Sequence, residues 1–114
     1  STMQIYHNPR CRKSRETLQR IEAAGTTPQI IKYLETPPTR EELTAILRKL
    51  NIPAASLIRK GEAIYKEKYK GKELTEEEWI EAMLEHPKLM ERPIVVEGDR
   101  AVIGRPPENV DALL

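Results

Sequence analysis

The chain has 114 residues, of which 39% are hydrophobic and 32% charged, with a formal net charge of +1. This size and composition predict one folded domain, and because the chain has no Phe and one Trp, its core must consist mainly of aliphatic side chains. The balanced charge argues against nucleic-acid binding, and the lack of an apolar run of ~20 residues argues against a membrane protein.

The N-terminal part of the sequence alternates strand and helix patterns. Residues 3–7 predict a strand, residues 12–24 a helix that stops at Gly25, and residues 29–33 a second strand. A strand, a short helix and a strand in this order predict a parallel βαβ unit.

The middle of the chain is expected to be helical. Thr39 and Thr75 each begin a capping-box pattern, with a Glu three residues later, and each opens a helix. Residues 53–58 predict a short helical stretch, and residues 61–71 an exposed helix followed by a loop. The apolar stripe of the helix after Thr39 consists of Leu43, Ile46, Leu47 and Leu50.

The C-terminal part predicts strands at residues 94–97 and 101–104, joined by a turn at residues 98–100, and a helix at residues 108–114. A βαβ unit followed by a ββα unit is the thioredoxin-like arrangement, an α/β fold with a mixed four-stranded sheet. We therefore expect one thioredoxin-like domain over residues 1–114, with an inserted helical subdomain at about residues 39–90.

The only cysteine, Cys11, lies between the first strand and the first helix. Partial positive charge and unpaired N–H groups at a helix start stabilise an anion, so the pKa of a thiol there falls below its free value of ~8.5. The same environment attracts an oxyanion. A lone cysteine is also often a small buried apolar residue, and this alternative stays open at this point. The neighbouring cations are Arg10, Arg12, Lys13 and Arg15.

Residues 7–15 (HNPRCRKSR) resemble the active-site segment of the glutaredoxin-coupled, ArsC-type arsenate reductases. Four further segments match that family in the same order, so the resemblance covers nearly the whole chain. It points to the short form of the family, within the ArsC/Spx thioredoxin-like superfamily. The matching segments are YLETPPT at 33–39, LIRK at 57–60, HP at 86–87 with ERPIVV at 91–96, and GRP at 104–106.

The resemblance implies that Cys11 is the catalytic nucleophile and that Arg59, Arg92 and Arg105 bind the oxyanion. Guanidinium groups suit this role, because they stay charged and donate paired hydrogen bonds to tetrahedral anions. Arg59 alone would otherwise be interpreted as a surface residue at a helix end.

The implied reaction is the reduction of arsenate to arsenite through an adduct between arsenate and the Cys11 thiol. Since the chain has no second cysteine, glutathione and then glutaredoxin are expected to resolve this adduct. The expected partners are therefore arsenate, glutathione as co-substrate and glutaredoxin, with no bound cofactor, no metal, no nucleic acid and no membrane. We expect a monomer that acts in arsenic resistance in the cytoplasm, where thiols stay reduced.

Four residues are expected to support the site. Ser14 is expected to donate a hydrogen bond to the thiolate, or else is simply an N-terminal helix residue. His7 either bonds to the backbone at the strand end or tunes the site, and Asn8 either shapes the loop or caps the helix. Thioredoxin-like folds carry a cis-proline at the position of Pro93, which would direct Arg92 toward the cysteine.

Two other functions are considered. Spx-type regulators share the fold and bind RNA polymerase, but they commonly carry a C-x-x-C switch and lack the third arginine. This chain has Ser14 in the fourth position of that motif and retains Arg105, which favours the enzyme. A glutathione-dependent thiol reductase of the monothiol glutaredoxin kind is the other alternative.

Overall fold

The structure is a computed structural model that describes residues 2–114. The chain divides into two compact units. The first consists of the chain up to Thr36 together with Arg92–Leu114, and the second of Pro37–Glu91. The helical segment expected at about residues 39–90 lies in the second unit.

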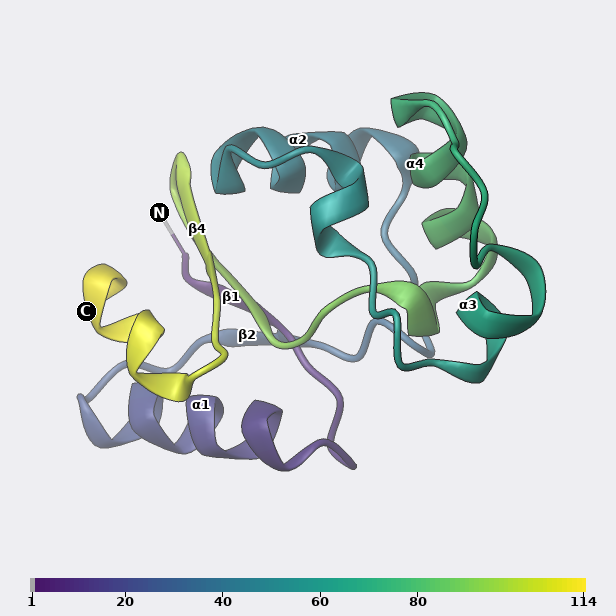
Figure 1. Cartoon of the computed structure of the whole chain (residues 1–114). Helices are drawn as coiled ribbons and strands as arrows, with labels where there is room; N and C mark the ends of the chain where they lie inside the picture. Colours follow the sequence, from purple (N-terminus) through teal and green to yellow (C-terminus); the bar gives the residue numbers. More distant parts are fainter. Residues whose placement is uncertain (1) are drawn as a thin grey trace. The chain divides into compact units, whose positions relative to one another are not determined.

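The first unit contains a mixed four-stranded sheet with the strand order β2-β1-β3-β4 (Figure 1). Strand β1 pairs with β2 in parallel and with β3 antiparallel, and β3 pairs antiparallel with β4. This is the predicted α/β, thioredoxin-like arrangement of a βαβ unit and a ββα unit. The elements are β1 (Gln4–Tyr6), α1 (Arg12–Ala23), β2 (Gln29–Ile31), β3 (Ile94–Glu97), β4 (Arg100–Ile103) and the 3-10 helix η3 (Pro107–Leu113).

Helix α1 and η3 pack against each other beside the sheet (Figure 1). Ile5 of β1 lies opposite Val95 of β3 in the sheet, and both side chains are fully buried. Burial of such aliphatic side chains stabilises the fold by roughly 1.5–3 kcal/mol each. The core cluster of this unit consists of Met3, Ile5, Ile21, Val95, Val110 and Leu113.

Several predicted boundaries in this unit are shifted by one or two residues. The first strand covers Gln4–Tyr6 rather than residues 3–7, the first helix ends at Ala23 rather than at residue 24, and the fourth strand covers Arg100–Ile103 rather than residues 101–104. The second strand ends at Ile31 rather than at residue 33, because the Lys32 carbonyl accepts hydrogen bonds from the N–H groups of Glu35 and Thr36 and so begins a turn. The C-terminal helix is a 3-10 helix that covers Pro107–Leu113 rather than residues 108–114.

The second unit is helical, and both predicted capping boxes are confirmed. The Thr39 hydroxyl accepts from the N–H of Glu42, whose carboxylate accepts from the N–H of Thr39, and Thr75 and Glu78 repeat the arrangement.

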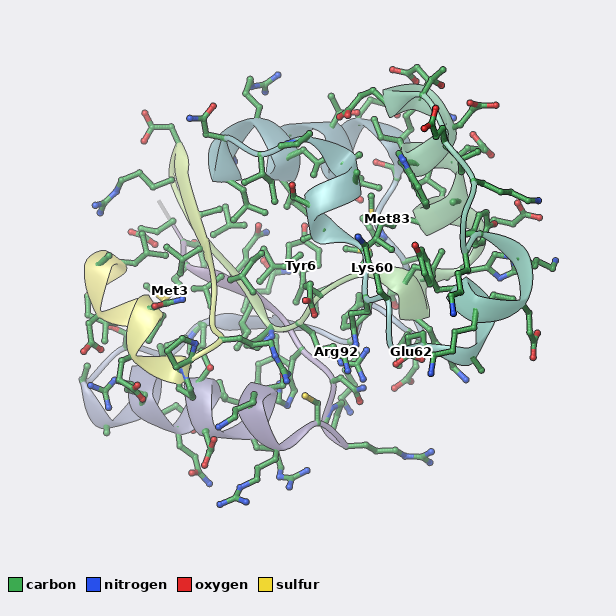
Figure 2. All side chains as sticks on the ribbon, viewed as in Figure 1. Met3, Tyr6, Lys60, Glu62, Met83 and Arg92 are labelled. Carbon is green, nitrogen blue, oxygen red and sulfur yellow. The ribbon has the colours of Figure 1, made fainter. Side chains whose placement is uncertain are left out.

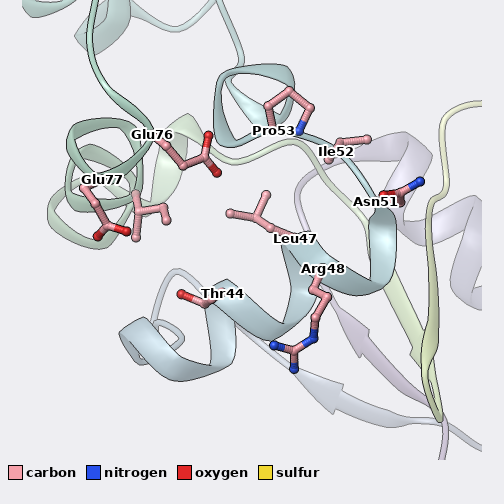
Figure 3. A pocket seen from close by; sticks show the side chains of 9 residues that line it. Thr44, Leu47, Arg48, Asn51, Ile52, Pro53, Glu76 and Glu77 are labelled. Carbon is pink, nitrogen blue, oxygen red and sulfur yellow. The ribbon is translucent and has the colours of Figure 1, made fainter.

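A hollow lies between α2, the turn that follows it and the start of α4 (Figure 3). The elements are α2 (Arg40–Leu50), η1 (Ala54–Leu57), α3 (Ala63–Lys68), α4 (Glu76–Glu85) and η2 (Pro87–Leu89). Among residues 2–114, no helix has the length and apolar character needed to cross a membrane.

Candidate active site

The loop between β1 and α1 holds Cys11 at the N-cap position of α1. The N–H of Cys11 donates to the Asn8 carbonyl at 2.9 Å, and the Cys11 carbonyl accepts from Arg15 at 3.0 Å, where the helix begins. The Asn8 side-chain oxygen accepts from the N–H of Arg10 at 3.0 Å, so Asn8 shapes the loop rather than capping the helix. Cys11 is partly exposed rather than a buried apolar residue.

The surroundings of Cys11 favour its thiolate. Burial by itself raises the pKa of the thiol, but hydrogen bonds from the backbone N–H of Ser14, the Arg92 side chain and the backbone N–H of Lys13 outweigh it and lower the pKa. Both N–H groups belong to the first turn of α1, so the start of this helix is directed at the sulfur. Cys11 therefore has the environment of a reactive cysteine.

Two of the three predicted arginines lie in the same unit as Cys11 and meet at its sulfur. Arg105 Nη1 lies 3.6 Å from Cys11 Sγ and 3.5 Å from the Arg92 carbonyl oxygen. Arg92 lies two residues before β3, at the end of the sheet near the start of α1 (Figure 2). The Arg92–Pro93 peptide bond is cis, as expected. The two guanidinium groups and the helix start together create an electropositive site around the thiol.

The position of Arg105 depends on residues that the sequence did not single out. Gly104 packs so closely that a Cβ atom there would lie 2.6 Å from Thr17 Oγ1 and 2.9 Å from Pro93 Cγ. The Thr17 hydroxyl lies 3.1 Å from the Gly104 carbonyl oxygen, and Asn109 Nδ2 donates to the carbonyl of Arg105 at 3.1 Å. The only sequence signal was Gly104 itself, as part of the GRP match.

His7 and Ser14 form a buried pair beneath the loop. His7 Nδ1 and Ser14 Oγ share a hydrogen bond of 2.6 Å, and the N–H of Asn8 donates to the same oxygen at 3.1 Å. The Ser14 hydroxyl therefore has partners other than the thiolate, and Ser14 acts on the sulfur through its backbone N–H. The His7 ring bonds to a side chain rather than to the backbone. Burial, with help from Lys32 and Arg15, lowers the pKa of His7.

Arg59 belongs to the second unit, where it is partly buried between two carboxylates. Its Nε lies 3.5 Å from a Glu62 oxygen and its Nη1 lies 3.4 Å from a Glu91 oxygen, with 22% of its side chain exposed. The N–H of Arg59 also donates to the Leu89 carbonyl at 2.7 Å. The guanidinium of Arg59 is thus positioned by Glu62 and Glu91 and is not that of a free surface residue. Its role as an oxyanion ligand stays a prediction.

The other cations near Cys11 form an exposed rim. Arg12 has 80% of its side chain exposed and lies 3.5 Å from Glu16, which also pairs with Lys13. Arg15 donates to the Pro9 carbonyl at 2.9 Å and so holds the loop. These contacts leave the rim positively charged, which attracts anions.

We also looked for a metal site and for catalytic side chains elsewhere in the described chain. Within residues 2–114, no three His, Cys, Asp or Glu side chains come together as a metal site would require. The hollow of the second unit is lined by helix side chains such as Leu47, Arg48 and Glu76, and among its described lining residues there is neither a thiol nor an imidazole (Figure 3).

A thioredoxin-like sheet with a reactive cysteine and two guanidinium groups at a helix start defines the class of thiol-dependent proteins with an electropositive site. The family model described as the ArsC family matches residues 6–113. The chain is 49% identical over 110 residues to the uncharacterized protein YfgD of Escherichia coli (strain K12), covering 95% of this chain and 92% of that protein.

Two further relatives are named arsenate reductase. The protein from Escherichia coli (strain K12) is 44% identical over 115 residues, which span 100% of this chain and 82% of that protein. The solved structure of the arsenate reductase from Vibrio cholerae has 48% identity and a TM-score of 0.95, covering 99% of this chain and 98% of that one. This chain belongs to the ArsC family.

Proposed function

We propose that this protein is an arsenate reductase in which Cys11 is the nucleophile and Arg59, Arg92 and Arg105 bind the oxyanion. The observation that carries the proposal is the 3.6 Å approach of Arg105 Nη1 to Cys11 Sγ, beside a thiol whose pKa is lowered. The similarity to relatives named arsenate reductase over nearly the whole chain supports the choice of arsenate.

The first chemical step forms a covalent adduct. The Cys11 thiolate attacks arsenic, an S–As bond forms, an As–O bond breaks, and the departing oxygen takes up protons and leaves as water. The guanidinium groups and the helix-start N–H groups stabilise the negative charge on the arsenate oxygens during this step. Ser14, His7, Asn8 and Pro93 are assigned supporting roles, because they hold the loop and the Arg92 backbone in place.

The second stage requires two electrons from outside the chain. Reduction of As(V) to As(III) converts two thiols into one disulfide, and the sequence supplies only Cys11. Glutathione as co-substrate and glutaredoxin as the second thiol donor fulfil this requirement, after which arsenite leaves and the Cys11 thiol is restored. A cytoplasmic monomer with a role in arsenic resistance fits this chemistry, since the cytoplasm keeps thiols reduced.

A coupled assay tests the proposal. Purified protein is mixed with arsenate, glutathione, glutaredoxin, glutathione reductase and NADPH, and the oxidation of NADPH is followed. We expect arsenate-dependent turnover that Cys11→Ser abolishes and Arg92→Ala reduces, while Arg48→Ala, an arginine of the second unit outside the proposed set, retains it. Turnover by Cys11→Ser would refute the assigned nucleophile. Higher activity on a glutathionylated protein than on arsenate would favour a thiol reductase instead.

A further inference from the structure

We propose that a hollow formed by the β1–α1 loop and the segment after β2 binds the peptide part of the reducing thiol. The ligand class is a small thiol that carries carboxylates and an ammonium group, such as glutathione. This inference rests on the proposed function, because it assigns a binding place to the co-substrate of the same site.

The hollow has a volume of about 370 Å³, which falls within the range of ~300–1,000 Å³ typical of small-molecule sites. His7 and Asn8 line it and are buried at 6% and 8% exposure, so this part of its wall is held by the hydrogen bonds of the loop. Leu34 also lines it and has 39% of its surface exposed. The hollow therefore combines fixed polar groups with an apolar side chain.

Three charged side chains line the same hollow: Arg10, Lys32 and Glu35. All three are exposed, and within the described residues none of them takes part in an ion pair. A second hollow of this unit differs in this respect, because both of its cations are paired: Lys13 with Glu16, and Arg20 with Asp111.

The charges at Arg10, Lys32 and Glu35 complement those of glutathione. The tripeptide has two carboxylates and one ammonium group around a central thiol, and two cations and one carboxylate line the hollow. Each contact is exposed and individually weak, so the set gives modest affinity and orientation rather than tight binding. This suits a co-substrate that binds, reacts and leaves as a disulfide.

The hollow adjoins the nucleophile through the loop itself. Arg10 directly precedes Cys11, and the bond from the N–H of Cys11 to the Asn8 carbonyl closes a tight turn, which keeps the Cα atoms of such a pair within about 7 Å of each other. Arg105, which follows β4, and the N–H groups at the start of α1 also contact this sulfur. A thiol held in the hollow would therefore lie close to the adduct on Cys11.

Steady-state kinetics test the assignment with the single variants Lys32→Ala and Glu35→Ala. We expect the single variants to raise the apparent KM for glutathione about threefold to fivefold, with the KM for arsenate unchanged. Lys72→Ala, which removes an exposed lysine of the second unit, is the matched control. An unchanged KM for glutathione in both single variants, with wild-type turnover intact, would overturn the inference.

A binding measurement separates this inference from the proposed function. Titration of the wild-type protein with S-methylglutathione, which cannot react, is followed by backbone amide NMR shifts. We expect saturable shifts at residues 7–10 and 32–35, weakened in Lys32→Ala and for the dimethyl ester of the ligand, whose carboxylates carry no charge. Shifts confined to other segments, or none at all, would overturn the assignment even if arsenate is turned over. Binding at these residues without arsenate turnover would retain the hollow and refute the proposed function.

Discussion

Arg105 Nη1 lies 3.6 Å from Cys11 Sγ, although 94 residues separate the two in the sequence. The same Nη1 atom also donates to the Arg92 carbonyl oxygen at 3.5 Å, which helps to fix the position of the guanidinium. An anion at the thiol would therefore meet a donor that is already in place, which lowers the cost of ordering it on binding.

Removal of this donor should weaken oxyanion binding. Since a hydrogen bond to a charged group contributes about 1.5–3 kcal/mol, Arg105→Ala should raise the KM for arsenate by about tenfold or more. Arg105→Lys should give an intermediate value, because a lysine keeps the charge but loses the paired donors. The KM is measured in the coupled assay with Arg48→Ala as the control. A KM equal to that of the wild type in Arg105→Ala would remove Arg105 from the oxyanion site.

Arg92 should control the ionisation of the thiol. The Arg92 side chain lowers the pKa of Cys11 by its hydrogen bond and by its charge, so Arg92→Ala should move that pKa upward. At neutral pH the thiolate fraction then falls, and alkylation by iodoacetamide slows. The pH dependence of the alkylation rate gives the pKa directly. The same midpoint in Arg92→Ala and wild type would show that the helix-start N–H groups alone hold the thiolate.

Gly104 should tolerate no side chain. A Cβ atom would lie 2.6 Å from Thr17 Oγ1 and 2.9 Å from Pro93 Cγ, and because both neighbours are buried, Gly104→Ala should lower the free energy of unfolding by about 1–3 kcal/mol. The matched control is Gly61→Ala, where the new atom would meet nothing within 4 Å. Urea unfolding of both variants makes the comparison, and equal stability would mean that Thr17 and Pro93 move apart without cost.

The local parts of the fold were predictable from the sequence, because strand patterns and capping boxes depend on residues a few positions apart. The helix-start position of Cys11 was predictable for the same reason. The approach of Arg105 to Cys11 came only from the resemblance to a family, since no local pattern joins residues of separate elements. The contact of Gly104 with Thr17 was not predictable, because it depends on how closely β4 and α1 pack.

The capping box at Thr75 should contribute measurably to the second unit. Its hydroxyl accepts from the N–H of Glu78 at 3.2 Å, and loss of such a cap costs about 1 kcal/mol. Thr75→Ala should therefore lower the urea midpoint without a change in the slope of the transition. Ser56→Ala, which removes an exposed hydroxyl of η1, is the control. If the two variants unfold alike, the cap contributes nothing to stability.

His7 should make the fold sensitive to acid. Burial, with help from Lys32 and Arg15, lowers the pKa of His7 in the folded protein, while in the unfolded chain the pKa is about 6.5. Above that pH both states are neutral at His7, so it contributes no pH dependence there. Below it the unfolded chain binds the proton first, so the free energy of unfolding falls from about pH 6.5 down through the folded pKa. His7→Asn replaces the imidazole by an amide that does not titrate, and should show a shallower loss of the free energy of unfolding below about pH 6.5 in urea unfolding. Carboxylates titrate in both proteins, so the difference between the two curves isolates His7. Parallel curves over this range would show that protonated His7 is accommodated in the folded site.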